Sequence, residues 1–386
     1  MDLILHIGSA KAGSTAVQSL LDQNVERLAD RGVWVARSLG GISARHLAPC
    51  FMEPTQADDF SERHGLTAST RRQHFIEQTF NALRDELAQA RWHGCSRMVI
   101  SSEHLQSRLL SESSVLRCID ALSSFFEAIH LVLYLRRQDR ALLSRTSEYL
   151  RGGWVAWGDQ EAFTHARAHR CATDFYNYHE LVSRWSDALD RLDITATNRF
   201  DIRVLDERSG LRPNVADDFF TLLDIADLPT TVKTPSRSHI GLPLSAQAIL
   251  WLFNRWVGEG NRARPSVVKM REVLLDRVSL KYQGASWRPS QLDAERFYSQ
   301  FEKANQQLKR RWHVSYVRPT GIDAPAYGDT LFDNDFSTYP QSADRVEWRR
   351  MIRDFREILI DMDADYSDDM AEVRGLMRQA RAEIRL

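Results

Sequence analysis

The N-terminal segment of the chain constrains the fold most strongly, because a short apolar run leads through a glycine-containing loop into a helical pattern. The apolar run, Leu3–Ile7, is typical of a buried strand. After the loop, apolar residues return at helical spacing, at Val17, Leu20, Leu21, Val25 and Leu28. A strand, a glycine loop and a helix N-terminus in this order can hold a phosphate on backbone N–H groups. The segment therefore predicts an α/β fold with a phosphate-binding loop after its first strand.

The lysine of this loop lies at an unusual position. In the nucleoside-triphosphate loop, GxxxxGK[ST], lysine directly follows the second glycine. Here Ser14 takes that place after Gly13, and Lys11 comes two residues before the glycine. Small residues still allow close approach of a phosphate, while Ser14 and Thr15 add hydroxyl donors and Lys11 adds a charge. The alternative interpretation is an ordinary strand-to-helix turn without a ligand.

Strand-like runs alternate with helical patterns through the first half of the chain. Further strands are predicted at Gly32–Ala36, Arg97–Ser102, Ile129–Leu135 and Ile202–Leu205. Helices are predicted from Ser14 and near Arg71–Trp92, Ser113–Phe126, Asp139–Arg151, Asp174–Leu192 and Val215–Leu223. This alternation predicts a parallel β-sheet flanked by helices.

The pattern becomes helical after Pro243. Four helical segments are predicted there, at Leu244–Trp256, Ser266–Leu280, Gln291–Trp312 and Glu347–Ile384. We therefore expect an α/β core over residues 1–242 and a C-terminal helical extension over 243–386, packed on the core within one structural domain.

The charge and the hydrophobicity of the chain argue against some classes of binding partner. A net charge of −1 lacks the basic excess of a general nucleic-acid or anionic-membrane binder. The chain contains no apolar run long enough to span a membrane and no credible signal peptide, so we expect a cytoplasmic protein. The short run His165, His169 and Cys171 has no second ligand pair, and no metal site is expected.

A second polar cluster follows the most apolar predicted strand, in "YLRRQDRALLSRTSEY". Arg136 ends this strand, and Ser144 lies eight residues later in the next predicted helix. Ligands of open α/β sheets bind at the carboxyl ends of the strands. An arginine guanidinium suits a phosphate there, because it can donate two parallel charge-assisted hydrogen bonds.

The loop and this arginine–serine pair together resemble the sulfotransferases that use 3′-phosphoadenosine 5′-phosphosulfate (PAPS), and in particular their bacterial branch. The family's K-x-G-[ST]-[ST] motif is matched by Lys11-Ala12-Gly13-Ser14-Thr15, and its 3′-phosphate motif by Arg136 and Ser144. The stretches "ISSEHL", "RSHIGLPLSAQA" and "LFDNDFSTYP" also look like this branch. The resemblance implies a P-loop-like sulfotransferase core in which residues 11–15 bind the 5′-phosphosulfate and Lys11 stabilises the charge of the leaving phosphate.

The resemblance also implies a general base after the third predicted strand. Cytosolic sulfotransferases have a catalytic histidine in a His-Leu pair, which His104 matches, whereas other branches use a glutamate, which Glu103 matches. Adjacent residues at a strand end usually point apart, so one of the two is expected to face the acceptor. Glu103 is favoured because the bacterial branch shares a glutamate there, and His104 stays an alternative.

Other site residues are predicted from their place in the chain. Arg237, in a late basic loop, is expected to complete the nucleotide site by analogy with the family, although the fuller Arg-Lys-Gly motif is absent. Trp154 and Trp157, among glycines, could stack on a sugar ring or an aromatic acceptor, and His46 could line the same side.

The predicted function is transfer of a sulfonate from PAPS to a hydroxyl, or an amine, of a carbohydrate or small metabolite. The products would be the sulfonated acceptor and adenosine 3′,5′-bisphosphate (PAP), with no metal required. The alternatives are a P-loop small-molecule kinase and a catalytically inactive nucleotide-binding protein. The sequence does not predict the acceptor's identity or the oligomeric state.

Overall fold

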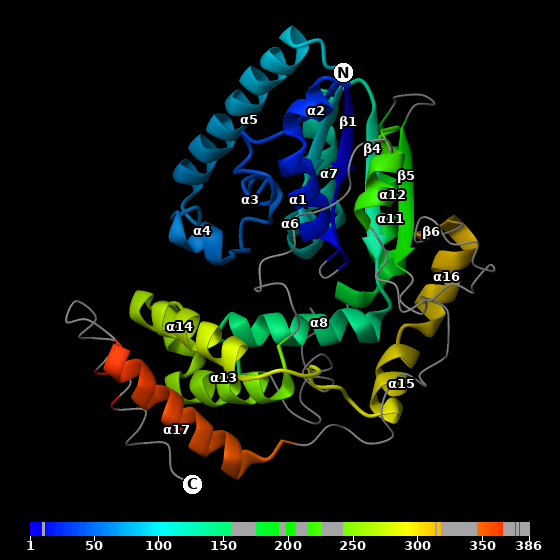
Figure 1. The fold of residues 1–386 in the computed structure, drawn as a ribbon. Helices are drawn as coiled ribbons and strands as arrows, with labels where there is room; N and C mark the ends of the chain where they lie inside the picture. Colours follow the sequence, from blue (N-terminus) through cyan, green and yellow to red (C-terminus); the bar gives the residue numbers. More distant parts are fainter. Residues whose placement is uncertain are drawn as a thin grey trace. The chain divides into compact units, whose positions relative to one another are not determined.

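The computed structural model describes residues 1–9, 12–155, 175–192, 198–205, 215–225, 242–312, 315–317 and 346–365, together with 375 and 378 (Figure 1). Contacts divide the chain into two compact units that are interleaved along the sequence. We call Met1–Gln138, Asp174–Thr234 and Phe301–Asp333 the sheet unit. We call Asp139–Thr173, Pro235–Gln300 and Asn334–Leu386 the helical unit. The sequence interpretation had instead drawn one boundary between residues 242 and 243.

The sheet unit is built on six parallel strands in the order β2-β3-β1-β4-β5-β6. The strands are β1 (Asp2–His6), β2 (Val33–Val35), β3 (Arg97–Ser101), β4 (Ile129–Leu135), β5 (Arg199–Leu205) and β6 (Ser315–Val317). In the register, Leu3 of β1 lies beside Met98 of β3 and Ile129 of β4. The central strands read as apolar runs because helices cover both of their faces.

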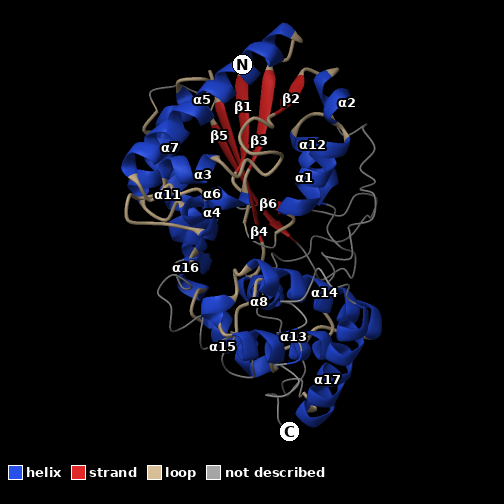
Figure 2. Ribbon diagram, turned by 90° about the vertical axis from the view of Figure 1, so that its left-hand side faces the viewer, coloured by secondary structure: helices blue, strands red, loops and turns tan. Residues whose placement is uncertain are grey.

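Alternate side chains of the strands face two different hydrophobic cores, and helices lie on both faces of the sheet (Figure 2). Leu3 and Leu5 pack in a core with α5 (Ser69–Trp92), α7 (Glu112–Ser123) and α11 (Tyr178–Asp190). Ile4 faces the opposite core, with α1 (Ser14–Gln23), α2 (Val25–Ala29) and α12 (Val215–Leu222). The predicted α/β class, with a parallel sheet between helices, is confirmed.

The helical unit contains most of α8 (Gln138–Arg151), with α13 (Leu244–Val257), α14 (Pro265–Lys281), α15 (Gln291–Ser299), α17 (Trp348–Asp365) and the short 3-10 helix η2 (Glu259–Asn261). Asn254 of α13 donates from Nδ2 to the carbonyl oxygens of Leu150, at 2.8 Å, and Trp154, at 3.0 Å. The Arg262 guanidinium lies 4.0 Å from the centroid of the Trp154 ring. Trp154, predicted as an acceptor contact, thus takes part in the packing of this unit.

Several short elements differ from the sequence predictions. The helix from Ser14 divides at Asn24, and the predicted Gln291–Trp312 helix divides into α15 and α16 (Glu302–Trp312). The polar loop after β2 contains α3 (Leu47–Phe51) and α4 (Asp59–Arg63), and α6 (Glu103–Arg108) follows β3 directly. Helices of five or six residues complete fewer than two turns, so hydrophobic periodicity cannot reveal them. Strand β6 was also not predicted.

Within the described ranges, no helix combines the length and the apolar character needed to cross a bilayer.

Candidate functional site

Three predicted parts of the site, the glycine loop, Glu103 and Arg136, lie at the carboxyl ends of three neighbouring strands. β1 leads into the glycine loop, β3 into Glu103 and β4 into Arg136. β1 lies between β3 and β4, and the chain passes from one side of β1 to the other between those two strands. Open α/β sheets bind ligands at such a switch in strand order, outside the carboxyl ends.

Two glycines shape the loop that joins β1 to α1. Gly8 has φ +59° and Gly13 has φ +92°, in the left-handed region that favours glycine. A Cβ atom on Gly8 would lie 2.7 Å from Cα of Glu103, and one on Gly13 would lie 2.7 Å from Cγ2 of Val215. Glycine is therefore required at both positions, and the loop backbone lies directly against Glu103.

The loop also carries buried hydroxyl groups. Ser9 and Ser14 are buried, and neither hydroxyl has a hydrogen-bond partner in the part of the chain that the structure describes. Ser14 opens α1, whose first N–H groups have no acceptor within the helix. Hydroxyl and N–H donors therefore gather at the start of this helix, with Ala12 buried beside them and Thr15 following in its first turn.

Glu103 is the first residue of α6, where the helix dipole favours a negative charge. Gln18 of α1 donates from Nε2 to Oε2 of Glu103 over 2.5 Å. The Glu103 side chain keeps 32% of its surface exposed. The carboxylate is therefore held on one oxygen and still reaches solvent.

His104 lies in the same helical turn rather than at a strand end. Its Nε2 is 3.7 Å from Oε1 of Glu103, so the two side chains are close together and do not point apart as expected. Burial, together with the positive charges of Arg108 and Arg45, lowers the pKa of His104 to about 3. His104 is therefore a neutral imidazole at neutral pH.

Two arginines and an aspartate that the sequence did not single out lie near His104. Asp58 accepts hydrogen bonds from Nη2 of Arg45 at 2.6 Å and Nε of Arg108 at 2.5 Å. Burial opposes the ionised form of Asp58, but these bonds and the Ser61 N–H outweigh it and hold its pKa well below the usual range. Because the three residues are far apart in sequence, no local motif marks the cluster.

Arg136 and Ser144 fall in different units. Arg136 follows β4 in the sheet unit, and its backbone carbonyl accepts a hydrogen bond of 2.7 Å from the Tyr178 hydroxyl. Ser144 belongs to the helical unit, within α8. Lys11, Trp157 and Arg237 lie outside the described residues.

His46, predicted as a possible acceptor contact, packs among aromatic rings. Its ring centroid lies 5.3 Å from Phe75 and 5.4 Å from Phe60. Gly40 lies so close that a Cβ there would be 2.5 Å from Cδ2 of His46. Burial lowers the pKa of His46, with His64 and Arg45 contributing to the lower value. The imidazole therefore helps to pack the segment between β2 and α5.

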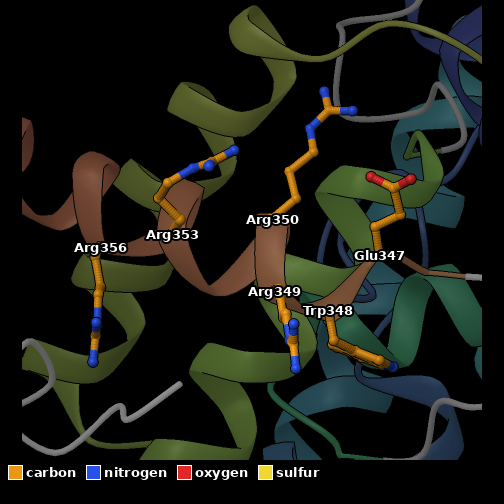
Figure 3. Close-up of a pocket in the computed structure, with 6 residues that line it drawn as sticks. All are labelled: Glu347, Trp348, Arg349, Arg350, Arg353 and Arg356. Carbon is orange, nitrogen blue, oxygen red and sulfur yellow. The ribbon is translucent and has the colours of Figure 1, made fainter.

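The helical unit carries a groove of about 680 Å³ along α17 (Figure 3). It is lined by Glu347, Trp348, Arg349, Arg350, Arg353 and Arg356. Arg350 and Arg353 share one carboxylate, Asp354, at 3.8 and 4.0 Å. These two side chains point to one side of the helix, and Arg349 and Arg356 point to the other (Figure 3). The guanidinium groups therefore do not converge on one ligand.

Comparisons of the chain with protein-family models, characterised proteins and solved structures found no match.

Proposed function

We propose that this protein is a PAPS-dependent sulfotransferase with a P-loop-like core. The observation that carries the proposal is the contact between the glycine loop and Glu103, where Gly8 leaves no room for a Cβ atom. A loop suited to a phosphate and a carboxylate suited to removing a proton therefore adjoin each other. Sulfonate transfer needs both groups at one place, because the acceptor oxygen attacks sulfur while the bond from sulfur to the phosphate breaks.

The residues of the loop suit the donor. PAPS supplies the sulfonate and two anionic groups, its phosphosulfate and its 3′-phosphate. The Ser14 hydroxyl, which has no hydrogen-bond partner among the described residues, and the first N–H groups of α1 can donate to the 5′-phosphate. Arg136, at the end of the neighbouring strand, can hold the 3′-phosphate. The role of Ser144 stays a prediction from the sequence motif.

The proposed reaction is an in-line displacement. Glu103 accepts the proton of the acceptor hydroxyl as the oxygen forms a bond to sulfur. The bond between sulfur and the 5′-phosphate oxygen breaks, and PAP leaves with the electron pair. Lys11 and the loop donors stabilise the charge that grows on the leaving oxygen. Each role uses a group that the chain itself provides, without a metal ion.

Ligand binding separates this proposal from its alternatives. We expect PAP to raise the melting temperature in EDTA, because the loop and Arg136 would neutralise its two phosphates directly. A ligand that binds only the native state at a hundredfold excess over Kd stabilises it by about 2.7 kcal/mol. Adenosine 5′-monophosphate, which lacks the 3′-phosphate, should stabilise less. Arg136→Ala should weaken PAP binding and leave binding of the monophosphate nearly unchanged.

The opposite pattern would identify a kinase. Stabilisation that requires magnesium and favours ATP over PAP contradicts the sulfotransferase proposal. An inactive nucleotide-binding protein would bind PAP normally but release no PAP from PAPS in the presence of any acceptor.

A further inference from the structure

A chain of buried polar side chains leads from the interior of the sheet unit to Glu103. Nδ1 of His6 lies 2.8 Å from the Ser101 hydroxyl. The Gln18 amide nitrogen lies 3.5 Å from that hydroxyl and 2.5 Å from Oε2 of Glu103. His6, Ser101 and Gln18 are each at most 8% exposed, whereas Glu103 reaches solvent. These hydrogen bonds thus connect the fully buried imidazole of His6 to Glu103, the base of the proposed reaction.

The donor and the acceptor of each of these hydrogen bonds can be assigned by counting protons. The Gln18 nitrogen can only donate, so Ser101 Oγ and Glu103 Oε2 both accept from it. The single proton of the Ser101 hydroxyl can then be donated to Nδ1 of His6. Burial lowers the pKa of His6 to about 3, so its ring is neutral and can accept at that nitrogen. In this assignment the ring proton of His6 lies on Nε2, a buried atom that has no hydrogen-bond partner within the described residues.

The position of Gln18 on its helix indicates why an amide is present. Val17 and Leu21 of α1 are fully buried apolar residues of the same core, and Gln18 is nearly as buried as they are. A buried amide without strong partners destabilises a fold. The bond to Ser101 is long, so the short bond to the carboxylate is the main compensation.

We infer that Gln18 is a positioning residue that holds Oε2 of Glu103 and leaves Oε1 to take the acceptor's proton. The inference rests on the proposed function. Oε1 is the oxygen nearer His104, whose Nε2 is 3.7 Å away. Gln18 touches neither the donor nor the acceptor in this scheme. It acts by fixing the orientation of the Glu103 carboxylate. Without Gln18, the Glu103 side chain would adopt this orientation only part of the time.

A double-mutant cycle tests the inference. The four enzymes are the wild type, Gln18→Met, Glu103→Gln and the double variant, with Gln23→Met as a control on the exposed end of α1. PAP release from PAPS is followed with a mixture of simple sugars and phenols as acceptors. We expect Gln18→Met to lower kcat by about 10- to 100-fold, because this is the typical contribution of a hydrogen bond to a charged group. The affinity of Gln18→Met for PAP should stay unchanged. The control variant Gln23→Met should keep wild-type activity.

The decisive comparison is the effect of Gln18→Met once the carboxylate is gone. In the Glu103→Gln background, it should lower the residual rate by less than threefold. An equal loss in both backgrounds would overturn the inference, because Gln18 would then act without Glu103. Gln18→Asn, which keeps the amide but is one methylene shorter, should lose activity as Met does, and full activity of the Asn variant would also contradict the role. A wild type that neither binds PAP nor releases it from PAPS would refute the proposed function itself.

Discussion

Glu103→Gln is expected to lower kcat by roughly 10²- to 10⁴-fold, the contribution typical of a general base. Glutamine keeps the size of the side chain, and its carbonyl oxygen can still accept the Gln18 hydrogen bond. What it loses is the capacity to take a proton from the acceptor hydroxyl. The affinity for PAP should therefore stay close to that of the wild type, as measured by calorimetry, while the rate of PAP release from PAPS falls.

His104→Ala is the matched comparison for the second base candidate. Burial lowers the pKa of this imidazole to about 3, and a base works best with a pKa near the working pH. Only 17% of its side chain is exposed. We therefore expect His104→Ala to reduce kcat far less than Glu103→Gln. If His104→Ala were the more damaging change and Glu103→Gln nearly neutral, the base would be His104.

Gly8→Ala is expected to lower kcat about a hundredfold, the loss that a displacement of about 1 Å in a site can cause. A methyl group at this position would lie 2.7 Å from Cα and 2.9 Å from Cβ of Glu103. The loop or the start of α6 must therefore move, which separates the phosphate-binding loop from the base. The rate of PAPS turnover measures the effect on catalysis, and PAP affinity measures the effect on the phosphate-binding loop.

Gly94→Ala provides the control for backbone strain. Gly94 has φ +75°, close to the +59° of Gly8, but nothing lies within 4 Å of its added Cβ. Gly94→Ala should lose about 1 kcal/mol of unfolding free energy from the left-handed backbone alone, measurable by urea denaturation. Gly8→Ala should lose more, because its methyl group also meets Glu103. Only Gly8→Ala should lose activity. Equal activity of the two variants would show that the contact between the loop and Glu103 does not matter for turnover.

The sheet could be predicted from sequence because its signals are local. Ile129–Leu135 is a continuous apolar run with helices on both faces, and β4 has the same bounds. The glycines of the first loop likewise indicated a tight strand-to-helix connection, and Gly8 and Gly13 do adopt positive φ angles. The order of the strands was not predicted, because pairing between distant strands leaves no periodic signal in either one.

The partners of the site residues could not be predicted for a related reason. Gln18 and Glu103 are 85 positions apart, and only the neighbouring places of β1 and β3 in the sheet bring them together. Glu103 itself was found from a family resemblance, but its helix was not, because α6 has only six residues. The expectation that Glu103 and His104 diverge assumed a strand, whereas adjacent positions in a helical turn allow the two side chains to approach.

The most direct test of the proposed function is to identify the group that the enzyme transfers. The protein is incubated in EDTA with PAPS and a panel of sugars, phenols and amines, and the products are analysed by mass spectrometry. We predict PAP and a sulfonated acceptor in equal amounts from the wild type, and both formed roughly 10²- to 10⁴-fold more slowly by Glu103→Gln. A panel in which PAPS is not consumed, while ATP and magnesium yield a phosphorylated acceptor, would contradict the assignment and identify a kinase.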